Sequence, residues 1–138
     1  MISLKGINKE YTQGIKAVDN LNLEIKDGEI FGILGPNGAG KTTTISMITG
    51  ITEPTMGEIK INNIDINKNP VEAKMQFGYV PDSPDMFLRY KGIEYLNFMG
   101  DVYNVSESDR EDRIKELAER FEMTNALGDK IKILYTFI

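Results

Sequence analysis

The chain has 138 residues, of which 41% are hydrophobic and 27% are charged, and this is the size and composition of one folded domain. It contains no cysteine and no histidine, which excludes disulfides, thiolate or imidazole metal sites, and catalysis by a thiol or an imidazole. A formal net charge of -5 argues against extended nucleic-acid binding, because that needs a basic surface.

The first part of the chain predicts β-structure. Residues 2–11 mix apolar and polar positions loosely, and residues 17–25 (AVDNLNLEI) alternate cleanly, which is typical of half-buried strands. A turn at Asp27-Gly28 follows. Residues 29–35 (EIFGILG) form a short apolar run, which predicts a strand buried on both faces of a sheet.

Helices and strands alternate in the next part. Residues 41–50 (KTTTISMITG) predict a helix that ends at its last glycine. Residues 57–66 (GEIKINNIDI) predict a strand with an Asn-Asn turn, and residues 70–75 predict a short helix opened by proline. Residues 77–80 (FGYV) predict another buried strand.

The second half of the chain predicts helices. Residues 92–103 and 106–123 carry apolar residues at helical spacing, and Ser106 and Asp109 suit a capping arrangement. The final residues, KILYTFI, alternate in a way that predicts an edge strand or an exposed apolar tail. The change of character near Pro84 divides the chain into a portion at 1–83 that holds a phosphate loop and a partial helical portion at 84–138.

A phosphate-binding pattern follows the predicted strand at 29–35. Gly35, Gly40, Lys41 and Thr42 satisfy the spacing G-x-x-x-x-G-K-[ST]. Glycines permit positive φ angles, so consecutive backbone N–H groups at the start of the following helix can converge on one anion. The alternative is a glycine turn with an incidental lysine.

Each position of this loop has an expected role. Lys41 reaches the β- and γ-phosphates, and the Thr42 hydroxyl ligates Mg²⁺. The residues expected to bind the nucleotide through this loop are Asn37, Gly38, Ala39, Gly40, Lys41, Thr42 and Thr43.

Three segments together resemble the ATP-binding subunit of an ABC transporter: DGEIFGILGPNGAGKTTTISMITG, PTMGEIKINNIDI and FGYVP. The resemblance runs from Ile2 to about Lys132 and points to the prokaryotic exporter type. It implies an α/β fold, namely a P-loop NTPase sheet core with an amino-terminal antiparallel β portion and an incomplete helical subdomain. It also implies ATP and Mg²⁺ as cofactors.

The resemblance assigns roles to three further residues. Tyr11 matches the aromatic residue that stacks on adenine, although it is also an ordinary edge or core residue. Thr43 matches a residue that binds near the α-phosphate. Asp82 stands where the family usually has glutamine, and as a hard oxygen ligand it is a second candidate for Mg²⁺, or else a solvated aspartate in a turn.

The residues that complete hydrolysis in this family have no match in the sequence. It contains no apolar strand ending in the Walker B aspartate and catalytic glutamate, no Ser-Gly-Gly signature and no switch histidine. We therefore interpret the chain as an amino-terminal portion of a transport ATPase, truncated before the signature motif. We expect it to bind ATP weakly and not to hydrolyse it, with no complete catalytic set.

The resemblance also implies partners and a location. A membrane-spanning transporter subunit and a second ATPase subunit in a head-to-tail dimer are expected, and nucleic acid is not. The amino terminus lacks a signal-peptide core and no apolar run reaches membrane-spanning length, so we expect a cytoplasmic protein held at the membrane by its partner. Self-association through uncovered strands is a further hypothesis.

Two other functions remain as alternatives. The first is a noncatalytic, nucleotide-responsive module that binds a partner through an exposed sheet edge. The second is an unrelated small-molecule kinase, which ranks last because no acceptor-site or lid residues are recognisable.

Overall fold

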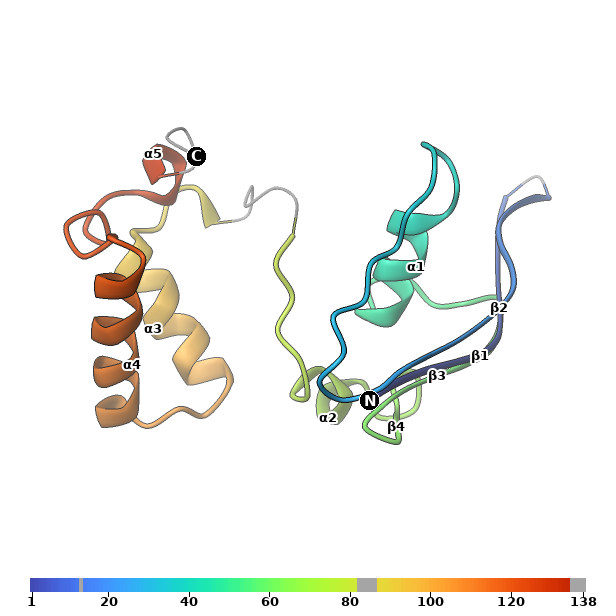
Figure 1. The fold of residues 1–138 in the computed structure, drawn as a ribbon, viewed down its shortest axis with the longest axis horizontal. Coiled ribbons are helices and arrows are strands. Elements are labelled where there is room, and N and C mark those ends of the chain that lie inside the picture. Colours follow the sequence, from blue (N-terminus) through green and yellow to red (C-terminus); the bar gives the residue numbers. More distant parts are fainter. Residues whose placement is uncertain (13, 82–86, 135–138) are drawn as a thin grey trace. The chain divides into compact units, whose positions relative to one another are not determined.

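The computed structural model describes residues 1–12, 14–81 and 87–134. The chain divides into two compact units, Met1–Tyr79 and Val80–Ile138, which are described separately here. The first unit holds a small sheet with two helices, and the second is helical (Figure 1).

The first unit is built on a four-stranded antiparallel sheet. Its strands are β1 (Ile2–Tyr11), β2 (Ile15–Ile25), β3 (Met56–Ile61) and β4 (Ile64–Asp65). The strand order is β2-β1-β3-β4, and Leu4 of β1 lies opposite Leu23 on one side and Ile59 on the other. The predicted strands at 2–11, 17–25 and 57–66 are therefore confirmed.

A bulge explains why the apolar pattern of the first strand is loose. Leu4 and Ile7 are both fully buried although they are three positions apart, which a regular strand would place on opposite faces. The register of β1 against β2 shifts between these two residues, and Gly6 has a φ of 58°. The irregular segment turns both side chains to the same face.

The turn between β3 and β4 is a two-residue hairpin. Asn62 and Asn63 have φ angles of 48° and 67°, and Ile61 pairs with Ile64 on either side. Asparagine tolerates this left-handed conformation better than most residues, and two such residues suit the twist of a hairpin. The predicted Asn-Asn turn is thus confirmed.

Helix α1 (Lys41–Ile48) covers one face of the sheet (Figure 1). Met47 is fully buried in the same cluster as the core residues of β1, and Thr44 is also buried. The helix ends two residues before Gly50, whose φ of 65° lets its amide bond back to the Met47 carbonyl oxygen at 3.1 Å. Tertiary packing therefore supports a helix that is rich in β-branched threonine.

Helix α2 (Pro70–Lys74) begins with proline, as predicted, and buries Ala73. Ahead of it, an Asp65 side-chain oxygen accepts hydrogen bonds from the amides of Asn67 at 2.9 Å and Lys68 at 3.2 Å. The Lys68 ammonium lies 3.1 Å from the same carboxylate. Burial raises the pKa of Asp65, but these hydrogen bonds and the Lys68 charge outweigh it and hold the pKa below its ordinary value.

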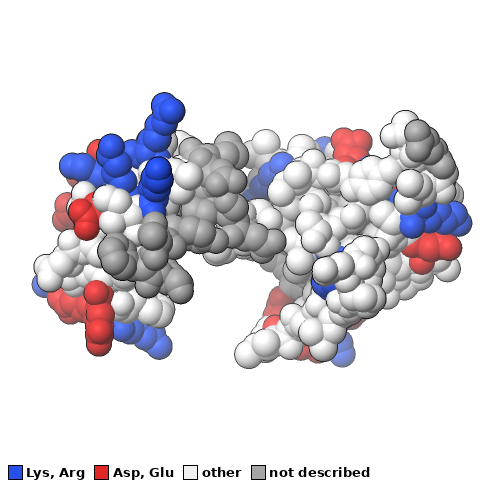
Figure 2. All heavy atoms as spheres, turned by 90° about the horizontal axis from the view of Figure 1, so that it is seen from above, with Lys and Arg blue, Asp and Glu red and all other residues white. Residues whose placement is uncertain are grey.

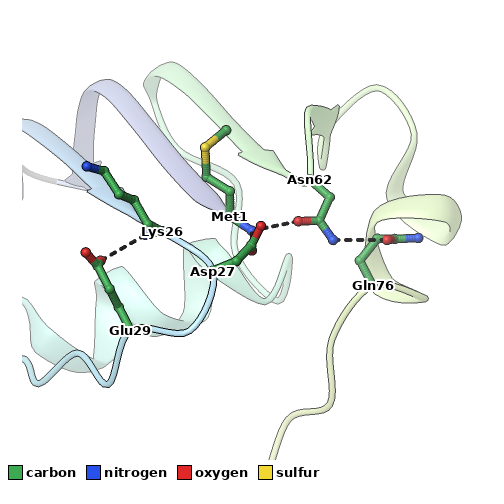
Figure 3. Close-up of polar contacts among 6 residues, drawn as sticks. All are labelled: Met1, Lys26, Asp27, Glu29, Asn62 and Gln76. Atoms are coloured by element: carbon green, nitrogen blue, oxygen red, sulfur yellow. Dashed lines mark hydrogen bonds and ion pairs between the residues drawn. The ribbon is translucent and has the colours of Figure 1, made fainter.

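Polar contacts tie the first residue to two turns of the unit (Figure 3). The amino group of Met1 donates to a carboxylate oxygen of Asp27 and, at 2.7 Å, to the side-chain oxygen of Asn62. The Asn62 amide nitrogen donates in turn to Gln76 at 3.1 Å. These contacts join the end of β2, the β3–β4 turn and the segment after α2.

Two predicted strands are not strands in the structure. Residues 29–35 and 77–80 have no regular secondary structure, and Ile30, Leu34 and Val80 are 104%, 95% and 90% exposed. A strand persists only when neighbouring strands accept its backbone hydrogen bonds and cover its faces. Within the part of the chain that the structure describes, neither segment pairs with another strand.

The second unit contains helices α3 (Gly92–Val102), α4 (Glu107–Arg120) and α5 (Ile131–Leu134). The predicted cap is confirmed, because the Ser106 hydroxyl oxygen accepts a hydrogen bond from the Asp109 amide at 3.2 Å. The predicted edge strand at 132–138 is wrong over residues 132–134, which lie in α5, while residues 135–138 lie outside the described part. No described helix is long and apolar enough to cross a membrane.

Close packing between α3 and α4 depends on a glycine. A Cβ built on Gly100 would lie 2.3 Å from Nε of Arg110. The Arg110 guanidinium donates to Asp101 at 2.6 Å and to the Val105 carbonyl oxygen at 3.1 Å.

Figure 2 shows side chains of both charges over the helical unit, whereas much of the visible face of the sheet unit is uncharged.

Candidate functional site

The loop that precedes α1 contains a tight turn. The Ala39 amide donates to the Pro36 carbonyl oxygen at 3.2 Å, and Gly38 has a φ of 83°. A glycine with positive φ at the third position of such a turn is typical of a type II turn. The predicted need for glycine at this position follows from this geometry.

Gly40 is held against the sheet. It is the residue before α1 and has a φ of 81°. A Cβ at this position would lie 2.4 Å from the backbone oxygen of Ala17 on β2. Only glycine fits here without displacing either backbone, so β2 fixes where the helix begins. Sequence reasoning missed Ala17, since no local pattern links it to a loop so far along the chain.

The amino-terminal end of α1 has free donors and no anion of its own. The first hydrogen bond of the helix joins the Thr44 amide to the Gly40 carbonyl oxygen at 2.8 Å. The amides of Lys41, Thr42 and Thr43 therefore have no acceptor within the helix. The first turn of this helix contains no acidic residue, and Gly40 provides no side-chain cap. The positive end of the helix dipole and three backbone donors are therefore open to an external anion.

Lys41 lies across the same loop. Its Nζ donates to the carbonyl oxygens of Gly35 and Pro36, each at 2.7 Å. An ammonium group has three donors, so one remains for a further acceptor. The structure thus places a cation beside the open helix end, with a flexible stem that allows it to turn from the loop carbonyls to a phosphate oxygen.

Of the two predicted magnesium ligands, the structure describes only Thr42. Thr42 is exposed in the first turn of α1, beside the open amides. A hydroxyl oxygen next to a bound phosphate suits a hard cation such as Mg²⁺, which takes few protein ligands and several from phosphates and water. Asp82 lies outside the described residues.

A cavity of about 460 Å³ adjoins the loop. β2 contributes one wall, and residues 31–34 with Ala39, Lys41 and Thr44 contribute the other. Val18 and Asp19, which sequence reasoning also missed, line it. Its lining is mainly apolar, with Lys41 and Asp19 as the charged residues, and Thr42 and Thr43 are not part of it.

Tyr11 is the last residue of β1 and is 45% exposed. The Lys9 ammonium lies 5.3 Å from the centre of its ring, within the range of a cation–π contact. Tyr11 is not among the described residues that line the cavity. The structure therefore brings together the loop residues from Asn37 to Thr43 but does not add Tyr11 to them.

Comparisons with known proteins point to the same family as the residues of the loop. A family model described as ABC transporter matches residues 18–135. The chain is 36% identical over 133 residues to the linearmycin resistance ATP-binding protein LnrL of Bacillus subtilis, covering 96% of this chain and 42% of that protein. It is 37% identical over 125 residues to the lipopolysaccharide export system ATP-binding protein LptB of Escherichia coli, covering 88% and 52%.

Solved structures give the same result. An ATP binding subunit of an ABC transporter superposes with a TM-score of 0.87 at 29% identity, covering 94% of this chain and 54% of that one. A dimeric ATP-binding cassette in a post-hydrolysis state with ADP and Pi gives 0.81 at 28%, covering 95% and 62%. The chain spans about half the length of these relatives. The predicted α/β P-loop NTPase fold class is confirmed, and the chain belongs to the family of ABC transporter ATP-binding domains.

Proposed function

We propose that this chain supplies the phosphate-binding part of an ABC transporter ATPase that energises transport by binding and hydrolysing ATP. The observation that carries the proposal is the open amino-terminal end of α1, where three backbone amides lie beside the Lys41 ammonium. Such an arrangement binds phosphate through fixed dipoles and one mobile charge.

Each residue of the loop has a separate role in the proposed site. Gly38 and Gly40 set the curvature of the loop. The amides of Gly38, Gly40, Lys41, Thr42 and Thr43 hold the phosphate oxygens, while the Ala39 amide stays bonded to Pro36. The neighbouring Asn37 and Ala39 complete the turn. Lys41 releases the carbonyls of Gly35 and Pro36 and turns to the β- and γ-phosphates.

The roles of Thr42, Asp82 and Tyr11 complete the proposed site. Thr42 holds Mg²⁺, with Asp82 as a second ligand, and the ion neutralises charge on the triphosphate when bound. Tyr11 stacks on adenine. For Tyr11 to do so, adenine must reach the exposed end of β1 or the β1–β2 hairpin must move toward the loop.

The proposal extends to partners and location. Residues 1–83 form the nucleotide-binding portion, and residues 84–138 form a helical portion that contacts a membrane-spanning subunit. A second ATPase subunit completes the site in a head-to-tail dimer, which is supported by the solved dimeric cassette with ADP and Pi. The protein then works in the cytoplasm at the membrane surface. Relatives named for Nod factor export and lipopolysaccharide export support an exporter.

Thermal unfolding of the purified chain with and without Mg·ATP tests the proposal. Ligand that binds only the folded state raises stability by about 2.7 kcal/mol at a concentration one hundred times its Kd. We expect a higher melting temperature for the parent chain and for Lys26→Ala, which removes an exposed lysine of the same unit. We expect no shift for Lys41→Ala. A parent chain that shows no shift at millimolar Mg·ATP would contradict nucleotide binding.

The absence of turnover is a separate part of the proposal. This sequence of 138 residues has no match for the Walker B aspartate, the catalytic glutamate, the signature or the switch histidine. We expect phosphate release at the rate of a protein-free control. Magnesium-dependent hydrolysis that disappears in Lys41→Ala would overturn this part while supporting the binding site.

A noncatalytic partner-binding module is the second candidate. The exposed apolar segment before the loop favours it, because Ile30 and Leu34 are almost fully exposed and can pair with a strand from another chain. Light scattering distinguishes this case, since self-association through such a segment gives a mass that grows with concentration. A monomer at all concentrations would count against self-association.

A further inference from the structure

The phosphate loop contains a chemically labile pair, Asn37-Gly38. Asn37 is the only asparagine of the sequence that glycine follows. Its side chain is exposed, and within residues 1–12, 14–81 and 87–134 it makes no hydrogen bond. A Cβ at Gly38 would meet nothing within 4 Å. The Asn37 side chain and the space above Gly38 are therefore both open to water.

The Gly38 amide does not take part in the hydrogen bond that closes the turn. The donor that closes the turn is the Ala39 amide, which bonds to Pro36 at 3.2 Å. Gly38 itself has a φ of 83°, a conformation that glycine adopts at no steric cost. The backbone nitrogen that must lose its proton is thus not protected by the fold.

We propose that Asn37-Gly38 is a site of spontaneous deamidation that converts the phosphate loop into a form with weakened anion binding. The Gly38 backbone nitrogen forms a bond to Cγ of Asn37, and the side-chain nitrogen leaves as ammonia, taking up the proton of the Gly38 amide. Water then opens the five-membered succinimide at either carbonyl. The products are aspartate and isoaspartate, with ammonia lost, water gained and no oxidant consumed.

Either product changes the loop. Aspartate adds a negative charge beside the amides that face the anion, and isoaspartate adds the same charge together with one extra backbone atom. Repulsion between this carboxylate and a triphosphate weakens binding roughly tenfold or more at the distances within such a loop. A bound triphosphate engages the Gly38 amide and slows the reaction, and this protection rests on the proposed nucleotide binding.

The chain provides its own control in Asn20 and Asn22. Both are followed by leucine, whose side chain hinders attack by the next amide. Asn22 also accepts a hydrogen bond from the Gly6 amide at 2.8 Å and donates to the Asn20 carbonyl oxygen at 3.0 Å. Cleavage after lysine separates these residues from Asn37 into different peptides, 17–26 and 27–41.

The test incubates the full chain at mildly alkaline pH without nucleotide and follows the peptides by mass spectrometry. We expect peptide 27–41 to gain about one dalton at Asn37, as two chromatographic products, faster than peptide 17–26. Isomerisation at Asp27-Gly28 leaves the mass unchanged and is located by fragmentation. Modification at Asn37 no faster than at Asn20 and Asn22 would overturn the inference.

Two variants and one ligand complete the experiment. Asn37→Gln, whose longer side chain cyclises more slowly, should lose the mass gain, and Asn37→Asp should bind Mg·ATP roughly tenfold or more weakly while its circular dichroism stays unchanged. Undiminished binding by Asn37→Asp would refute the effect on anion binding. Mg·ATP should slow deamidation several-fold in the parent chain but not in Lys41→Ala. If the parent chain binds no ATP, the proposed nucleotide binding is refuted, and the mass gain of peptide 27–41 still tests the deamidation on its own.

Discussion

Nζ of Lys41 lies 2.7 Å from the carbonyl oxygen of Gly35, six residues earlier, so the loop's own backbone holds the cation of the phosphate loop. A second contact of the same length joins it to Pro36. These two hydrogen bonds fix the ammonium beside the open amides of α1. In the proposed site, a phosphate oxygen takes the third donor of the ammonium and then replaces the two carbonyl oxygens, which its full negative charge favours.

We first predict a structural role for Lys41 in the absence of nucleotide. Lys41→Ala removes both hydrogen bonds to the loop and should lower the free energy of unfolding by about 1 kcal/mol. Lys41→Met keeps the apolar stem and isolates the contribution of the ammonium. Denaturant unfolding of the three chains measures the difference. Equal stabilities would show that the lysine contacts do not hold the loop.

Gly40→Ala should destabilise the first unit by more than the cost of placing alanine at a positive φ. The added Cβ meets the Ala17 oxygen at 2.4 Å, and the φ of 81° costs about 1 kcal/mol for a residue with a side chain. We expect a loss of roughly 2 kcal/mol or more.

Gly28→Ala is the matched control for that variant. Gly28 has a similar φ of 80°, but an added Cβ meets nothing within 4 Å. It should therefore cost only about 1 kcal/mol. If the two variants were equally stable in urea, the contact between the loop and β2 would have no energetic weight.

The sequence predicts those elements whose signals are local. Ser106 caps α4, Pro70 opens α2, and the Asn62–Asn63 pair forms the hairpin, because each residue acts on backbone groups within a few positions. The predicted helix at 41–50 is confirmed as α1 for the same reason, since glycines stand at both of its ends.

The failures concern structure that depends on distant partners. The apolar runs at 29–35 and 77–80 suit buried strands, but a strand also needs neighbours, and the described chain places none beside them. The bulge that turns Leu4 and Ile7 to one face likewise depends on pairing with β2. Local patterns give no information on such long-range pairing.

The site shows the same division. The positive φ angles of Gly38 and Gly40 follow from the loop pattern. The approach of Gly40 to Ala17 and the fold-back of Lys41 to Gly35 do not, because they depend on how the loop packs on β2 and on the chain's own carbonyls.

Asp65 should make stability dependent on acidic pH. Its pKa is lowered in the folded state, so its contribution is complete above its unfolded value of about 3.8 and is lost as pH falls through the folded value. Asp65→Ala removes acceptors for two amides and should cost about 1 to 2 kcal/mol at neutral pH.

The pH dependence of that variant provides the check. Its stability difference from the parent chain should shrink below about pH 3.8. Asp65→Asn keeps a side-chain acceptor but not the charge that faces Lys68, and it should show a smaller loss. A difference that stays constant into strong acid would contradict an ionised Asp65 as its source.

Gly100 and Arg110 should be energetically coupled. Gly100→Ala forces Arg110 from a position in which it bonds to Asp101 and Val105, and this should cost about 1 to 2 kcal/mol in spite of the better helix propensity of alanine. In an Arg110→Ala background the same change should instead stabilise α3 by up to about 1 kcal/mol. A double-mutant cycle by circular dichroism measures the coupling. Additive effects would show that Arg110 does not need the space above Gly100.

Phosphate binding by the loop is tested by titrating the purified, isotopically labelled chain with Mg·ATP and following the backbone amide resonances of the loop. We expect saturable shifts that are largest for Gly38, Gly40, Lys41, Thr42 and Thr43, and that vanish in a folded Lys41→Ala chain. Amides that stay unperturbed at millimolar Mg·ATP, or shifts confined to other parts of the chain, would contradict phosphate binding by the loop.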